Sequence, residues 1–174
     1  IGLLSGILLI QAYLQEKTIR YWKQSTEIVD HLRDTFRWHD RSHVFVLNSP
    51  DNYNGIVMTR IIEAPSGIDE LIDFQTPKPY DGQMFDVYQY NMTTPLDGVK
   101  VEQTGPMQLK VTFNQWGNWW HRNGIGASAY ENDFYKAETL DYPYLITFKQ
   151  LPPNSAIIYQ DGEEWQEFKM KIEE

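Results

Sequence analysis

The chain of 174 residues, with 41% hydrophobic and 14% aromatic residues, has the length of one domain and enough apolar surface for one core. Its formal net charge of −9 argues against nucleic acid and against an anionic lipid surface, since binding to either depends on clustered cations. The absence of cysteine excludes disulfides, thiolate catalysis and Cys-ligated zinc.

The first fourteen residues, IGLLSGILLIQAYL, are uncharged and largely apolar. Apolar side chains on every face of a helix predict contact with lipid or with a protein core. At about 1.5 Å per residue the run covers roughly 21 Å, less than the ~20 residues that span a bilayer. No basic segment precedes it and no small-residue cleavage site follows it, which argues against a signal peptide. We expect either the end of a transmembrane helix, with part of the same protein missing upstream of Ile1, or a buried core helix or partner-binding face.

The helical pattern continues beyond this run without Gly or Pro. Apolar side chains recur on one side at spacings of three, four and seven, and charged side chains occupy the other positions. The apolar set is Trp22, Ile28, Val29, Leu32 and Phe36. The pattern predicts an amphipathic helix laid on a core, so that residues 1–38 form a helical segment and residues 39–174 a single α+β domain.

Short strands and turns are predicted next. Residues 43–47 are typical of a buried strand, residues 48–55 carry turn chemistry, and residues 56–62 offer a second strand. The apolar spacing after Ser66 predicts a short helix of two or three turns that has Ser66 as its N-cap and ends near Pro77.

The C-terminal hundred residues contain apolar runs bounded by Gly, Pro, Asn or Asp. Their alternation with polar residues is typical of antiparallel strands that have one wet face. The runs are 84–91, 98–101, 107–113, 144–150 and 156–159. Because helices come first and strands later, we expect an α+β fold in which the long N-terminal helix and a short helix pack on a mainly antiparallel sheet.

Four short motifs lie at the two ends of the chain. They are Trp22 in the first exposed turns of the helix, Asn48-Ser49-Pro50-Asp51 at the end of a strand, the Gly-led strand Gly55–Arg60, and Tyr159-Gln160-Asp161-Gly162 with Trp165 in a terminal hairpin. Together they resemble the C-terminal extracytoplasmic region of bacterial polytopic membrane proteins of the glycosyltransferase-like type. The resemblance implies an accessory domain on the periplasmic side, beside the transmembrane region of the same protein, with the catalytic carboxylates upstream.

The densest candidate binding site is the segment 114–126, NQWGNWWHRNGIG. Its candidate ligand-binding residues are Trp116, Trp119, Trp120, His121 and Arg122. Indole faces suit the C–H face of a pyranose and the polar side chains suit its hydroxyls, so a glycan is the expected ligand. The alternative interpretation is that these Trp side chains fill the core or shield a sheet edge.

Metal binding and catalysis have weaker support. His39 and His43 stand four apart, with Asp40 between them and His31 earlier, but His43 opens a predicted strand and no third ligand is evident. Four carboxylates that a glycosidase could use follow the Trp-rich segment, although such a cluster is also typical of a solvated face. They are Glu131, Asp133, Glu138 and Asp141. Nucleotide-loop and serine-nucleophile motifs are absent from the sequence. We therefore predict no catalytic residue, no metal ligand and no cofactor in this chain.

Two functions follow from these patterns. The first is a non-catalytic extracytoplasmic accessory or binding domain of a membrane-attached protein, such as a lipid-linked sugar transferase. The alternative is a free-standing soluble carbohydrate- or protein-binding module, whose first helix is buried against its own sheet. An independent hydrolase would need a cleft with convergent carboxylates. The exposure of five apolar side chains separates the first two: Leu3, Leu4, Ile7, Leu8 and Ile10.

Overall fold

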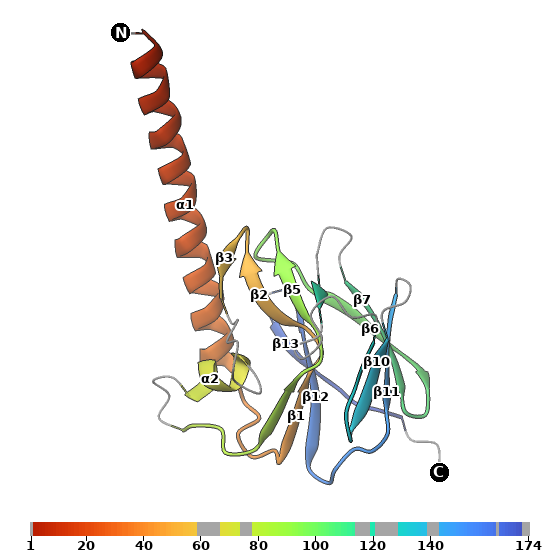
Figure 1. The fold of residues 1–174 in the computed structure, drawn as a ribbon. Coiled ribbons are helices and arrows are strands. Elements are labelled where there is room, and N and C mark those ends of the chain that lie inside the picture. Colours follow the sequence, from red (N-terminus) through yellow and green to blue (C-terminus); the bar gives the residue numbers. More distant parts are fainter. Residues whose placement is uncertain are drawn as a thin grey trace.

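The structure is a computed structural model that describes residues 2–58, 67–73, 78–113, 119–120, 129–138, 143–162 and 164–171. A long helix, α1 (Gly2–Thr35), projects from a body of strands, and a short helix, α2 (Gly67–Asp73), contacts it (Figure 1). The α+β class predicted from the sequence is confirmed.

The long helix is unbroken because residues 7–35 contain neither Gly nor Pro. Its inner half, residues 20–35, packs on the strands through a stripe at spacings of three and four that includes the buried Ile28 and Leu32. The Leu32 carbonyl accepts a hydrogen bond of 3.1 Å from the indole Nε1 of Trp165, which satisfies one of the carbonyls that a helix end leaves open.

One residue of the predicted stripe lies elsewhere. Trp22 was expected on the core side but is 60% exposed. The strands first meet α1 at Tyr21, whose ring packs edge-on against Tyr53 at 5.7 Å. Trp22 is turned by about 100° from Tyr21 on the helix, and this turn carries it away from the strands.

A four-stranded sheet in the order β13-β12-β1-β4 forms the middle layer. β1 pairs in parallel with both β12 and β4, and β13 pairs antiparallel with β12. The strands are β1 (His43–Val46), β4 (Gln83–Asp86), β12 (Ser155–Asp161) and β13 (Glu164–Phe168). Parallel strands are usually buried on both faces, and the burial of Val44, Phe45 and Val46 agrees with this.

A second four-stranded sheet, in the order β3-β2-β5-β8, continues from the first. Its strands are β2 (Ser49–Tyr53), β3 (Ile56–Val57), β5 (Gln89–Met92) and β8 (Trp119–Trp120). The chain passes from β1 to β2 and from β4 to β5, and these two paths stay side by side. Val87 N donates to Val46 O at 2.9 Å, and Ser49 N donates to Tyr88 O at 2.8 Å.

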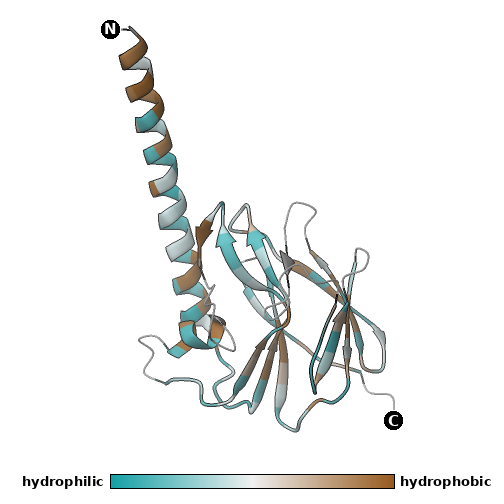
Figure 2. Ribbon diagram, viewed as in Figure 1, coloured by the Kyte–Doolittle hydropathy of each residue, from teal (hydrophilic) through white to brown (hydrophobic). Residues whose placement is uncertain are grey.

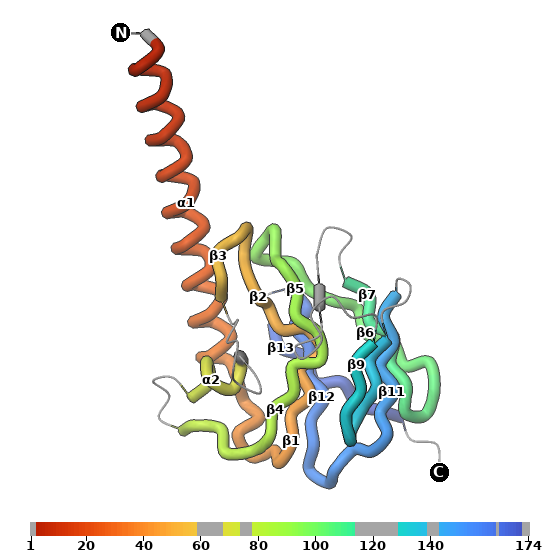
Figure 3. The backbone as a smooth tube through the Cα atoms, in the orientation of Figure 1, coloured from red at the N-terminus to blue at the C-terminus, as the bar shows by residue number. Residues whose placement is uncertain are grey.

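The third sheet is antiparallel, with the order β6-β7-β11-β10-β9 (Figure 3). Its strands are β6 (Val99–Gly105), β7 (Gln108–Phe113), β9 (Ala129–Glu131), β10 (Tyr135–Glu138) and β11 (Tyr144–Phe148). Alternate residues of β7, β10 and β11 are buried, as expected for strands with one wet face. Among the described strand pairs, most are antiparallel, in agreement with the prediction.

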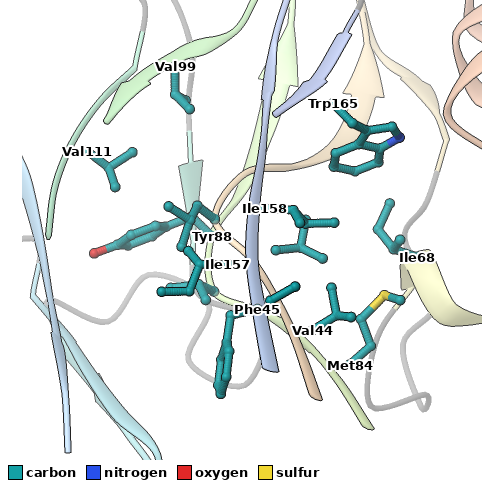
Figure 4. Close-up of a cluster of buried hydrophobic side chains, with 14 of the residues drawn as sticks. Val44, Phe45, Ile68, Met84, Tyr88, Val99, Val111, Ile157, Ile158 and Trp165 are labelled. Atoms are coloured by element: carbon teal, nitrogen blue, oxygen red, sulfur yellow. The ribbon is translucent and has the colours of Figure 1, made fainter. Parts of the chain in front are cut away.

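The core lies on both faces of the middle sheet (Figure 4). Phe45 faces the third sheet, where its ring lies 5.3 Å from that of Phe148 and 6.1 Å from that of Tyr135. Val44 faces the opposite side, toward Ile68 of α2. The helices, the middle sheet and the antiparallel sheet therefore form three layers.

The segment predicted to be a turn, residues 48–55, is a strand for most of its length. β2 runs through Pro50 and Asp51, and the pairing with β5 shifts by one residue between Pro50 and Asn52. Such a bulge accommodates a proline, which has no N–H for the ladder. The turn itself is confined to Asn54 and Gly55, whose φ angles of 47° and 88° are those of a tight hairpin turn.

Other boundaries also differ from the predictions. The run 84–91 forms two strands, β4 and β5, and the strand predicted over 56–62 is described only as far as Met58. The short helix is confirmed and is described over Gly67–Asp73, while its predicted N-cap Ser66 and its predicted end near Pro77 lie outside the described residues. The strands β9 and β10 were not predicted.

Candidate functional site

The outer half of α1, residues 2–19, is the largest unexplained feature of the described surface. Its eight large apolar side chains up to Leu14 are each between 46% and 82% exposed. They are Leu3, Leu4, Ile7, Leu8, Leu9, Ile10, Tyr13 and Leu14. Figure 2 shows these apolar turns at the end of α1 that points away from the strands. No described part of the chain buries this surface.

The two halves of α1 are joined by a polar transition. Arg20 forms an exposed ion pair with Glu16, and the Lys17 ammonium lies 5.6 Å from the centre of the Tyr21 ring. From Tyr21 onward the helix contacts the body: the Tyr53 hydroxyl donates to Gln24 Oε1 at 3.1 Å. Within about two turns, α1 thus changes from a helix without contacts to the strands to a helix packed on them.

Within the residues that the structure describes, no helix combines the length and apolarity needed to cross a membrane.

The Trp-rich binding site expected from the sequence cannot be placed as a whole. Trp116, His121 and Arg122 lie outside the described residues. Trp119 and Trp120 form β8, whose backbone pairs antiparallel with β5 opposite Tyr90 and Gln89. Their backbone therefore sits on the edge of the second sheet, and the glycan site stays a prediction.

The histidines considered as zinc ligands pack on aromatic rings. The His39 ring meets that of Phe36 edge-on at 4.9 Å, and its pKa is lowered by burial and by the charge of Lys78. His43 lies parallel to Phe85 at 6.4 Å. Among the described residues, no three His, Cys, Asp or Glu side chains are grouped as metal ligands would be.

Two of the carboxylates considered for a glycosidase, Glu131 and Glu138, lie on a wet face of the third sheet. Glu131 pairs with Lys149 at 2.7 Å and Glu138 with Lys136 at 2.8 Å. The hydrogen bond from Lys149 lowers the pKa of Glu131, whereas a general acid needs a raised one. Asp141 lies outside the described residues.

Two carboxylates with shifted pKa values, the half-buried Asp69 and the buried Asp97, had not been singled out from the sequence. Burial, with a smaller contribution from the charge of Asp86, raises the pKa of Asp69 in α2 to about 6. Asp97 behaves in the opposite way: burial alone would raise its pKa, but hydrogen bonds from the backbone and hydroxyls of Thr93 and Thr94 outweigh burial and lower it. Asp97 thereby holds the loop between β5 and β6 in shape.

Two hollows in the described surface were also not predicted. One of about 580 Å³ lies between the β6–β7 turn and residues 168–171. Another of about 320 Å³ lies between the inner half of α1, the loop at Pro95 and Gln160 of β12. The second draws its lining from segments more than 130 residues apart, so no local motif could have indicated it.

No protein-family model, no curated protein and no solved structure matched this chain.

Proposed function

We propose that this chain is a non-catalytic domain of a membrane-attached protein, held at the bilayer by the outer half of α1. The observation that carries the proposal is the exposure of every large apolar side chain between Leu3 and Leu14. A continuous apolar surface of this kind marks a contact with lipid or with another protein. These side chains surround the helix rather than forming one stripe. Lipid chains can contact all sides of such a helix, whereas the flat surface of a protein partner would cover only one side.

The energy available from this surface is large. Burying a Leu or Ile side chain contributes roughly 1.5 to 3 kcal/mol, so eight partly exposed apolar side chains offer on the order of 10 kcal/mol when moved into an apolar phase. Total domain stabilities are about 5 to 15 kcal/mol. Transfer of the outer half of α1 into lipid therefore has a driving force comparable to that of folding.

The geometry supports entry from one side of the bilayer. Residues 2–15 cover about 21 Å of helix, against a hydrocarbon core of about 30 Å. Charges begin at Glu16 and Lys17, and exposed aromatic side chains flank this point at Tyr13 and Trp22. Tyr and Trp favour the interface between lipid and water.

The net charge of −9 sets a condition on the attachment. An anionic surface repels the body, so binding depends on apolar insertion rather than on charge. We expect tighter binding to zwitterionic vesicles than to anionic ones, and added salt should reduce that difference by screening.

The remaining parts of the proposal have other support. The extracytoplasmic side and an accessory role beside a lipid-linked sugar transferase rest on the resemblance described above. The non-catalytic role agrees with the lysine-paired state of Glu131 and Glu138. The rival function, a free-standing soluble module, required the first helix to be buried against its own sheet, and in the described structure the strands meet α1 only from Tyr21 onward.

Flotation with phosphatidylcholine vesicles tests the attachment. Leu8 and Ile19 are a matched pair, because both are 57% exposed and they stand eleven residues apart, on the same face of α1. We expect Leu8→Lys to weaken vesicle binding at least tenfold, since a lysine in the middle of the apolar run opposes insertion by about 2.5 kcal/mol or more. Ile19→Lys should change it less than threefold.

Equal effects of the two lysines would overturn the proposal, as would wild-type chain that stays at the bottom of the gradient. Light scattering without lipid distinguishes membrane attachment from self-association. If the wild type forms a discrete oligomer that Leu8→Lys dissolves, and vesicles do not compete with it, the outer half of α1 is a protein interface instead.

A further inference from the structure

The hollow of about 320 Å³ beside α1 has the size of a small ligand site, for which volumes of roughly 300 to 1,000 Å³ are usual. Three side chains from α1 line it, Gln24, Glu27 and His31, together with the apolar Ile28. Pro95 and Gln160 complete the lining from the body. It lies apart from the outer half of α1.

The fixed element of this hollow is Gln160, which is only 1% exposed. Its backbone is held from both sides by one amide: Asn48 Nδ2 donates to Gln160 O at 3.0 Å, and Gln160 N donates to Asn48 Oδ1 at 2.8 Å. The side-chain Oε1 lies 3.2 Å from the hydroxyl of the buried Tyr90. The described residues provide no hydrogen bond to its Nε2. Gln160 lines the hollow, so a ligand bound there can accept a hydrogen bond from this amide group.

A second amide is arranged in the same way. Gln24 Oε1 accepts a hydrogen bond from the Tyr53 hydroxyl, which leaves Nε2 of Gln24 as a donor. Glu27 adds an acceptor, and it makes no ion pair within the described part of the chain. Ile28 and Pro95 add apolar surface.

This mixture selects one class of ligand. A carboxylate repels an anion, and two amide N–H donors are poorly suited to a cation. Hydroxyl groups donate and accept, so they can pair with the amides and the carboxylate together. The apolar lining suits the C–H face of a ring.

We propose that the hollow formed by Gln24, Glu27, Pro95 and Gln160 binds a neutral polyhydroxylated molecule, with the amides donating to its hydroxyls and Glu27 accepting from them. The ligand would contact α1 and β12 at once. Its binding does not require that the outer half of α1 enter a bilayer.

Nuclear magnetic resonance of the full ¹⁵N-labelled chain in phosphocholine micelles tests this site. The probes are glucose, galactose and N-acetylglucosamine as rings, and sorbitol and glycerol as open polyols. We expect saturable shifts of the Gln24 and Gln160 side-chain amide signals at millimolar concentrations. Rings should bind more tightly than open polyols if the apolar lining contributes.

Matched variants identify the groups that bind. Glu27→Gln keeps the shape of an exposed side chain and should weaken binding about tenfold, whereas Glu16→Gln, eleven residues away on α1, should leave it unchanged. Gln24→Met should also weaken binding about tenfold. Tyr53→Phe removes the same internal hydrogen bond but keeps the Gln24 amide, and it controls for damage to the fold.

The proposal is overturned if no probe shifts the two amide signals up to about 100 mM, a hundred times a millimolar dissociation constant. It is equally overturned if inorganic phosphate or ethylamine produces those shifts and the polyols do not. Leu8→Lys should bind the same polyols as the wild type, so a failure here is distinguishable from a failure of membrane attachment.

Discussion

The outer and inner halves of α1 belong to one continuous helix but have opposite surroundings. The outer half carries nine exposed large apolar side chains, whereas the inner half, which has fewer apolar residues, buries Ile28 and Leu32 under the strands. Judged by hydropathy alone, the outer half would be the more probable of the two to lie in the core. The inner half packs because its apolar groups form one stripe that a sheet can cover, and the outer half has no such stripe.

The largest difference between the halves should be seen when a leucine is truncated. Leu32→Ala is expected to lower the free energy of unfolding by about 3 kcal/mol, because it removes fully buried methyl groups and leaves a cavity. Leu8→Ala should change it by less than about 0.5 kcal/mol, since that side chain is exposed. Urea denaturation of both variants measures the difference, and similar losses would mean that the outer half is buried in solution.

The hydrogen bond at the end of the inner half gives a smaller effect. Trp165→Phe should destabilise the protein by about 2 kcal/mol, because the Leu32 carbonyl loses its donor and the core loses volume. Trp38→Phe is the control. Its indole donates to Glu167 at 3.1 Å, a carboxylate that also pairs with Lys169, so its loss should be milder. Thermal unfolding in which Trp38→Phe is the more damaging change would contradict this account of the helix end.

The pH dependence of stability tests the partial burial of Asp69 in α2. Asp69 has a folded-state pKa of about 6, above its ordinary value near 3.8, so the folded state binds the proton more tightly and this group's contribution to stability increases as pH falls from about 6 to 4. Asp69→Asn should remove that trend and stabilise the protein at pH 7 by about 1 kcal/mol, after allowance for solvent screening.

Denaturation midpoints of the wild type and Asp69→Asn between pH 4 and 7 measure this trend. Glu70→Gln, next to it in α2, should follow the wild-type curve. A constant offset between the wild type and Asp69→Asn at every pH would show that Asp69 does not titrate in this range.

Removal of residues 1–14 should have the smallest effect on folding. These residues make no buried contact in the described structure, so the free energy of unfolding should change by less than about 1 kcal/mol. Vesicle binding should be lost at the same time. A truncated chain that unfolds would show that the outer half supports the body, and the comparison between the two halves would then be wrong.

The prediction of local elements succeeded where residue periodicity is strong. The stripe through Ile28 and Leu32 and the alternation in β7 and β11 indicated the helix and two strands of the third sheet. The alternation in β10 was equally readable, with Tyr135 and Ala137 buried, but Glu138 was interpreted together with the nearby carboxylates as part of a solvated face.

The prediction of strand pairing failed where the paired strands are far apart in the sequence. β1 lies in parallel between β4 and β12, about 40 and 110 residues further along the chain, and no local pattern specifies such neighbours. Pro50 and Asp51 read as a turn because both residues favour turns, yet a bulge places them in β2. Trp22 fitted the helical spacing and is exposed because it is turned by about 100° from Tyr21, the residue that contacts the strands.

By itself, the sequence determined the fold class, the length of α1 and the need of its first fourteen residues for an apolar partner, because periodicity and hydropathy are properties of neighbours in the chain. Only the tertiary structure decided that the body leaves these residues uncovered. It also decided that Gln24, Glu27 and Gln160 meet around one hollow. Contacts of this kind depend on which distant strands pair and on where a helix first contacts a sheet. Both are determined by the packing of the whole chain, not by local sequence.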